Sequence, residues 1–201
     1  MSRLAPWRIA GFAATLLSVS PAAAHPHVWI DYTVNVLFDD NDLTGVRISW
    51  TFDQMYSSML FHDYTNRPKA ALSAADIASL EKNAFVDTAD EHYFIDIALN
   101  GETVPIKSVT DFTAHFENHR MTYVFTIPIA SGAAPARNTL KVDAFDYEYY
   151  IDFGLAKTDA VSVSHGEKLA AACAPHNEDK VTTTFGPIQA LVVVCTYAKT
   201  G

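Results

Sequence analysis

Apolar and polar side chains alternate along the first part of the chain. Between residues 28 and 38 every even-numbered side chain is apolar, and most of the side chains between them are polar. A second run with the same two-residue period leads from Val46 to Phe52, and a turn cluster of Asp and Asn at 39–42 separates the runs. Such alternation is typical of strands that bury one face. The pattern predicts a hairpin of two half-buried strands.

The period changes after Phe52. Apolar residues then recur three and four positions apart, which predicts a helix over 54–64. The apolar side of this helix would consist of Met55, Tyr56, Met59, Leu60 and Tyr64. Ser73 and Asp76 have the spacing of a capping box and predict the start of a second helix. We therefore expect a helical insert around 54–88.

Two turn sequences predict further hairpins. Alternating apolar residues begin at Tyr93 and lead into Asn100-Gly101, a sequence that favours the tightest hairpin turns. Asn118-His119 separates another pair of alternating runs in the same way. The middle of the chain is therefore predicted to be antiparallel sheet.

The last third is predicted to be mostly strand. The run at 140–153 flips its apolar parity near its middle, which indicates a turn or bulge. An Ala-rich stretch at 168–172 predicts a short helix, and 190–197 predicts a final strand. Together these elements predict a β-rich α+β fold, with antiparallel sheets in two layers and one domain over residues 25–201.

The first 24 residues have the layout of a cleaved secretory signal. Arg3 and Arg8 make its start positive, an apolar run follows at 9–19, and Ala22-Ala23-Ala24 fits a cleavage site of small residues. The alternative is an N-terminal membrane anchor, although the apolar run is shorter than the roughly 18–20 residues of a spanning helix. Cleavage after Ala24 would make His25 the first residue of an exported protein.

The net charge limits the classes of binding partner, and the cysteine content bears on the cellular compartment. The chain carries 14 basic and 23 acidic side chains, a net charge of −9. Nucleic acids and anionic membranes select basic patches, so neither is an expected partner. The two cysteines, Cys173 and Cys195, predict one disulfide in an exported chain. A pair of thiolate metal ligands is the alternative.

Candidate chemistry concentrates at His25-Pro26-His27, where the exported chain would begin. On a strand, side chains two apart share a face at a spacing of about 6.6 Å, so both imidazoles can approach one ion. Asp31 shares that face but lies about 13 Å beyond His27 by the same spacing, too far to be a co-ligand.

Asp53 is the best candidate for a third ligand. Pairing even-numbered residues with even-numbered residues leaves two hairpin registers, one with Asp53 opposite His27 and one with Asp53 opposite Trp29. In the first register the two histidines and Asp53 would form a zinc site. Asp53 also precedes a predicted helix, so its alternative role is that of an N-cap. The histidine pair could alternatively belong to an untethered N-terminal tail.

Pro26 limits the ways in which a metal could bind. It lacks an amide N–H, which excludes the square-planar copper or nickel chelate that requires a deprotonated second amide. Pro26 does not exclude bidentate coordination of a metal by the α-amine and the imidazole of His25, a mode that would suit copper. His62, which follows Asp53 on the predicted helix, and His119 in a turn are further candidate ligands, with plain solvent exposure as their alternative.

Other side chains carry less information. Asp146, Glu148 and Asp152 alternate with apolar residues, which predicts a row of carboxylates on one strand face. The sequence has no G-x-S-x-G, H-E-x-x-H or phosphate-loop motif, so no catalytic residues are predicted.

The opening motif, from His25 to Asp31 directly after a signal peptide, resembles a bacterial periplasmic family catalogued as a domain of unknown function. This family includes the ZevA-like zinc-uptake proteins and is often described as an ABC-type transport system periplasmic component. The segment from Trp50 to Met55 and the segment from Asp146 to Asp152 are similar to family features. The resemblance implies a periplasmic protein that serves an inner-membrane nickel, cobalt or zinc permease of the NicO/RcnA type.

Three functions follow as hypotheses. The first is a periplasmic accessory protein that binds a divalent metal, zinc before nickel or cobalt. The second is a metal-free interaction domain of a transport system, and the third is a copper-dependent redox enzyme that uses the amine of His25.

Overall fold

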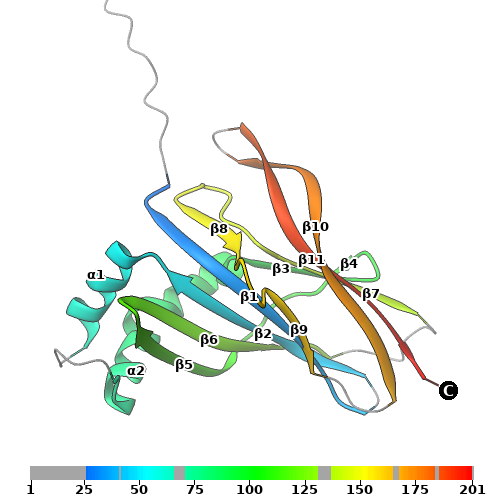
Figure 1. The fold of residues 1–201 in the computed structure, drawn as a ribbon, viewed down its shortest axis with the longest axis horizontal. Helices are drawn as coiled ribbons and strands as arrows, with labels where there is room; N and C mark the ends of the chain where they lie inside the picture. The colour runs from blue at the N-terminus through cyan, green and yellow to red at the C-terminus, as the bar shows by residue number, and fades with distance from the viewer. Residues whose placement is uncertain are drawn as a thin grey trace, which may run out of the picture.

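Two β-sheets form the body of the molecule in the computed structural model (Figure 1), which describes residues 26–40, 42–65, 71–130, 137–164, 168–183 and 186–200. Sheet A contains, in spatial order, β5 (Thr110–Glu117), β6 (Arg120–Pro128), β2 (Leu43–Phe52), β1 (Val28–Phe38) and β8 (Ile151–Leu155), and β9 (Val161–Ser164) also pairs with β1. Sheet B contains β10 (Leu169–Thr183), β11 (Gly186–Lys199), β7 (Asn138–Ala144), β3 (Ile95–Leu99) and β4 (Glu102–Thr103). The β-rich α+β class and the antiparallel hairpins are confirmed.

The predicted N-terminal hairpin forms the centre of sheet A. β1 and β2 pair antiparallel with even-numbered residues opposite each other, as in Ile30 with Phe52 and Tyr32 with Trp50. This register places the apolar residues of both strands on one buried face, which is the reason for the alternation. β8 and β9 join the other edge of β1 in parallel, an arrangement that the local pattern did not predict.

The helical insert follows β2. α1 (Gln54–Tyr64) has the predicted bounds, and α2 (Ala74–Leu80) begins with the predicted capping box of Ser73 and Asp76. A π-helical turn, η1 (Glu81–Phe85), and a 3₁₀ segment, η2 (Val86–Phe94), extend the insert beyond residue 88. Figure 1 places the two α-helices beside β5 and β6, on the side of sheet A away from β10 and β11.

The predicted apolar side of α1 is only partly right. Ser57 and Leu60 are the buried residues of the helix, whereas Met55 and Met59 point into solvent. Ser57 can be buried because its hydroxyl accepts a hydrogen bond from the Met121 amide at 2.8 Å and donates to the Phe52 carbonyl at 3.3 Å.

The core is aromatic and is shared by distant segments. Trp50 is buried against Phe125 of β6 and Phe153 of β8, and the insert adds Phe85 and Phe94 to the same cluster. The ring centroids of Trp50 and Phe125 lie 4.9 Å apart and the rings meet edge to face, a favoured aromatic geometry. The insert is therefore part of the core.

A hydrogen bond and a ring pair are among the contacts that join the two sheets. The Tyr32 hydroxyl of sheet A donates to the Leu191 carbonyl of sheet B at 2.7 Å. The rings of Phe38 and Tyr197 meet edge to face with centroids 4.9 Å apart.

Two predictions are wrong, and one predicted strand begins two residues later than expected. The Ala-rich segment at 168–172 is extended rather than helical, because β10 begins at Leu169 and pairs with β11. Tyr93 belongs to η2, and β3 begins only at Ile95. The carboxylates at 146–152 do not form a row on one strand, because the chain turns between β7 and β8.

Asp146 explains that turn. The parity flip predicted a turn or bulge, and the structure has a turn in which Asp146 is buried. Its carboxylate accepts hydrogen bonds from the amides of Glu148, Tyr150 and Ile151, each at 2.9 Å. The carboxylate thus accepts hydrogen bonds from amides in the turn and at the start of β8.

The predicted disulfide is present. Cys173 of β10 and Cys195 of β11 face each other across the hairpin and are bonded. Within the described ranges, no helix has the length and apolar character needed to cross a bilayer.

Candidate metal centre

His27 lies immediately before β1 with an exposed side chain. Its amide donates to the Tyr150 carbonyl at 2.9 Å, and its ring lies against the Tyr150 ring with centroids 4.8 Å apart. The turn organised by Asp146 therefore holds the start of the described chain in place. This contradicts an untethered tail at His27. His25 and the predicted cleavage site lie outside the described residues.

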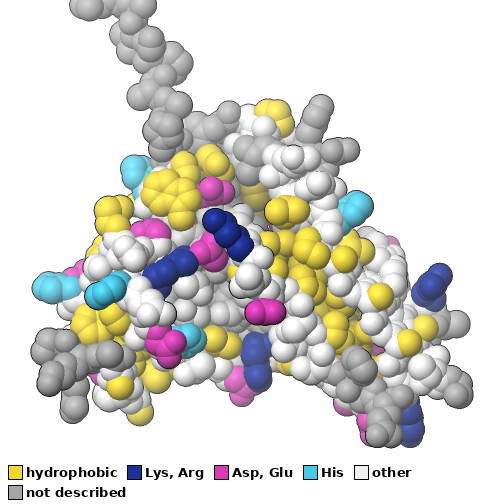
Figure 2. All heavy atoms as spheres, in the orientation of Figure 1, with side chains coloured by type: hydrophobic (Ala, Val, Ile, Leu, Met, Phe, Trp, Pro, Cys, Tyr) yellow, Lys and Arg dark blue, Asp and Glu magenta, His cyan; other side chains and the backbone are white. Residues whose placement is uncertain are grey.

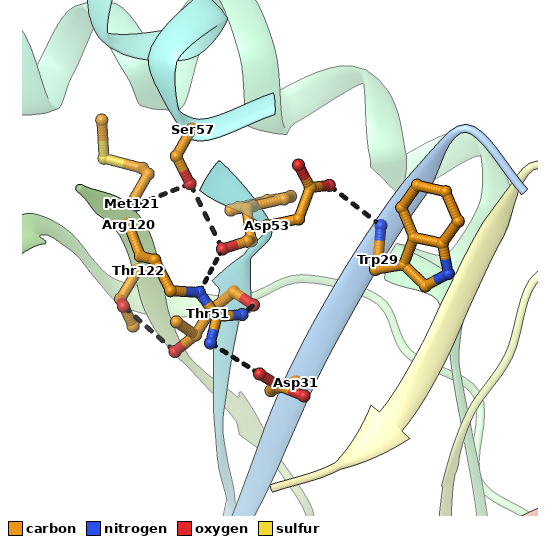
Figure 3. A network of polar contacts seen from close by, with 9 residues as sticks. Trp29, Asp31, Thr51, Asp53, Ser57, Arg120, Met121 and Thr122 are labelled. Atoms are coloured by element: carbon orange, nitrogen blue, oxygen red, sulfur yellow. Dashed lines mark hydrogen bonds and ion pairs between the residues drawn. The ribbon is translucent and has the colours of Figure 1, made fainter. Parts of the chain in front are cut away.

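The structure selects one of the two predicted registers. Ile30 pairs with Phe52, which sets Asp53 opposite Trp29 rather than His27. The Asp53 amide donates to the Trp29 carbonyl at 2.9 Å. In the other direction the Trp29 amide donates to Asp53 Oδ2 at 3.1 Å (Figure 3). His27 directly precedes β1 and Asp53 directly follows β2, so both lie at the same end of the hairpin. Continuation of the register past Ile30 would make them diagonal neighbours on one face, and such pairs have a spacing of about 7–8 Å.

Asp53 is also the N-cap of α1, which confirms the second of its two predicted roles. Its Oδ1 accepts the Tyr56 amide at 2.9 Å. Each carboxylate oxygen therefore receives one backbone N–H and keeps a second lone pair for a cation. Burial, followed by the nearby Tyr64, Tyr150 and Asp53, raises the pKa of Tyr56 above its ordinary value, so this phenol stays neutral beside the carboxylate.

Arg120 balances the charge of this region. Its guanidinium donates to Asp31 Oδ2 at 2.6 Å and to the carbonyls of Phe52 and Thr51 at 2.6 and 2.7 Å (Figure 3). Asp31 is therefore engaged in an ion pair, in addition to being too distant from His27 for a shared ion. A cation bound at Asp53 would have to tolerate the positive charge of Arg120 nearby.

The other two candidate ligands lie elsewhere. His62 is near the C-terminal end of α1, about 13 Å along the helix axis from Asp53. His119 occupies the exposed β5–β6 turn with φ of 62°, which confirms the turn predicted at Asn118-His119. In the described part of the chain, no three His, Cys, Asp or Glu side chains are grouped closely enough to hold one ion. Any such group at the N-terminus would therefore require His25.

Sequence reasoning missed the residues that position the candidate centre. Arg120, Ser57 and Tyr150 reach it from β6, α1 and the turn after β7, so only the tertiary fold brings them there. Asp146 did carry a local signal, because an Asp at the start of a turn commonly caps amides that follow it.

Comparison with known proteins places the chain in a family. It is 27% identical over 143 residues to an uncharacterized protein of Haemophilus influenzae, an alignment that covers 70% of this chain and 68% of that protein. A family model described as protein of unknown function DUF1007 matches residues 10–182. The chain therefore belongs to the DUF1007 family.

Proposed function

We propose that this protein is a periplasmic accessory protein that binds a divalent metal ion, zinc before nickel or cobalt, and serves a membrane metal permease. One observation carries the proposal: exposed His27 directly precedes β1 and Asp53 directly follows β2, so both lie at the end of the hairpin where the exported chain would begin. His25, two positions before His27, would supply the third ligand. Two imidazoles and a carboxylate form a donor set that zinc accepts.

Other features support the same proposal. The net charge of −9 raises the local concentration of cations. The disulfide is typical of proteins in an oxidising compartment, and export to such a compartment is what the predicted signal peptide implies. The link to a permease of the NicO/RcnA type rests on the resemblance of the opening motif to ZevA-like proteins.

Metal analysis of protein purified from the periplasm without chelators tests the proposal. The parent protein is expected to retain zinc, and His25→Ala/His27→Ala is expected to lose it. Asp53→Asn should weaken zinc binding while it keeps α1 intact, because Asn is as good an N-cap as Asp. His115→Ala, which removes an exposed histidine of β5, is the matched control. Equal zinc content in the parent and the double variant would contradict the proposed site.

A second function is favoured by exposed aromatic rings at the same place. Trp29 and Tyr150 are 45% and 56% exposed, and amphipathic aromatic residues are enriched in protein interfaces. A metal-free domain that binds a permease through these rings would co-purify with a membrane protein. Trp29→Ala should abolish that co-purification, whereas removal of metal should leave it unchanged.

A further inference from the structure

The outward side of α1 carries an unusual set of side chains. Met55 is 70% exposed and Met59 is 43% exposed, although methionine is among the residues most often buried. The side chain of His62, one turn further along, is 89% exposed. Buried Ser57 and Leu60 fix the opposite side of the helix against the core, so these three residues are held toward solvent.

The three residues lie on one stripe of the helix, at positions i, i+4 and i+7. At 100° per residue they fall within an arc of about 60°, and the rise of the helix separates neighbouring members by about 6 Å and 4.5 Å. Long methionine side chains can cross such distances, so two thioether sulfurs and one imidazole nitrogen can meet above the helix. Figure 2, which has the orientation of Figure 1, shows histidine and apolar side chains on the side of the molecule where α1 lies.

His62 is already oriented as a ligand. Its Nδ1 lies 2.8 Å from Oδ1 of Asp63. A carboxylate that accepts Nδ1–H fixes the tautomer with its lone pair on Nε2, and metal-bound histidines commonly have such a partner. The unengaged Nε2 is therefore the ring atom available to a metal. The C-terminal end of the helix adds a partial negative charge near a bound cation.

We propose that Met55, Met59 and His62 bind a soft monovalent ion, Cu(I), with Asp63 as the positioning residue for the imidazole. Thioether sulfur selects Cu(I), whereas zinc takes thiolate, imidazole and carboxylate ligands. The site thus differs from the zinc centre at the N-terminus in its place, its ligands and the ion it selects. Both cysteines of the chain are joined in the disulfide, so no thiolate competes for the ion.

Titration of the exported, disulfide-bonded chain with Ag(I), a redox-inert probe for Cu(I), tests the proposal. In methyl NMR spectra, one equivalent of Ag(I) should shift the methionine methyl signals that disappear in Met55→Leu and Met59→Leu. The signal of buried Met121 should not shift, which makes it an internal control. Leucine supports a helix as well as methionine does, so both variants should keep α1.

Affinities for Ag(I) give the second measurement. Met55→Leu/Met59→Leu and His62→Gln should each weaken Ag(I) binding, and Asp63→Asn should weaken it by roughly tenfold, at the lower end of the range for such partners. His115→Gln is the matched histidine control and should bind Ag(I) like the parent. Unshifted methyl signals, or equal affinities in the parent and the double methionine variant, would overturn the site.

The two metal proposals can fail separately. His27→Ala should leave Ag(I) affinity unchanged, and Met55→Leu/Met59→Leu should leave zinc content unchanged. Loss of Ag(I) binding in His27→Ala would overturn the separate site on α1, because it would show that Ag(I) binds at the N-terminus.

Discussion

Arg120 fixes the junction at which β2 ends and α1 begins. Its guanidinium donates to the carbonyls of Thr51 and Phe52 and pairs with Asp31, so it links β6, β2 and β1 at once. The next amide, that of Met121, donates to Ser57 in the first half of α1. These bonds hold Asp53 between a strand and a helix, where it can serve as both cap and candidate ligand.

Replacement of Arg120 by Met should therefore destabilise the protein. Hydrogen bonds from a charged donor contribute about 1.5–3 kcal/mol each, and the partly buried carbonyls of Thr51 and Phe52 would lose their partner. We expect unfolding in urea at a clearly lower midpoint, with the free energy of unfolding reduced by about 3 kcal/mol, the lower end of the range for two such bonds because both are only partly buried. Asp31→Asn removes only a half-exposed ion pair and should cost less than about 1 kcal/mol. Equal losses in the two variants would contradict a role for the carbonyl contacts.

Asp152 makes the stability depend on pH in an unusual direction. Burial on β8 raises the pKa of the Asp152 carboxyl above its ordinary value of 3.8. The folded state therefore holds this proton more tightly than the unfolded chain does. The contribution of Asp152 to stability is full below pH 3.8 and is lost as the pH rises through the folded pKa.

Asp152→Asn should accordingly stabilise the protein at neutral pH and lose this advantage in acid. The measurement is the midpoint of urea unfolding, compared between variant and parent at neutral pH and below pH 3.8. Asp90→Asn, at an exposed position of η2, is the matched control and should change little at either pH. A destabilised variant at neutral pH would show that the charged form makes a favourable contact.

At the scale of elements, local sequence patterns predicted the hairpins, which are formed by residues close together in the chain. The alternation from residue 28 to 52 predicted β1, β2 and their register parity, and the turn sequence Asn100-Gly101 predicted the β3–β4 hairpin. The Ala-rich segment at 168–172 was misjudged because its high helix propensity is weak beside the long pairing of β10 with β11. The parallel pairing of β8 with β1 joins residues more than a hundred positions apart, and no local pattern encodes it.

The disulfide should stabilise the β10–β11 hairpin. In the pairing of the described residues, β7 pairs with β11 only from Val193 to Tyr197. From Val192 back to Gly186, β11 pairs with β10 alone. Two-stranded hairpins are marginal in water. A bond across a sequence separation of 22 residues contributes roughly 3 kcal/mol on the chain-entropy model.

Cys173→Ala/Cys195→Ala is expected to lower the free energy of unfolding by about 2–4 kcal/mol. Hydrogen exchange should accelerate first in the amides of residues 188–192 and of the β10 residues that pair with them, because this part of the hairpin lacks the support of β7. A reducing agent should produce the same changes in the parent and none in the variant. Unchanged exchange in this part of the hairpin would show that other contacts hold it.

At the scale of the whole molecule, the candidate centre was predictable only in part. The strand period predicted that His27 and Asp53 lie at one end of the hairpin, as they do, and the capping role of Asp53 followed from its place before a helix. The partners that hold them, Tyr150 and Arg120, come from segments about 120 and 70 residues away along the chain. Their arrival depends on the packing of the entire fold.

The same packing predicts that the chain unfolds as one unit. The aromatic cluster around Trp50 takes rings from sheet A and from the helical insert, and Tyr32 donates across the sheets to Leu191. Neither the insert nor sheet B therefore has a core that is independent of sheet A. Urea unfolding followed by the fluorescence of buried Trp50, in a Trp29→Phe background, should coincide with unfolding followed by hydrogen exchange in β11. Tyr32→Phe should lower both midpoints together, because loss of the hydrogen bond reduces the free energy of unfolding by about 1 kcal/mol. Separate transitions would instead divide the chain into two domains.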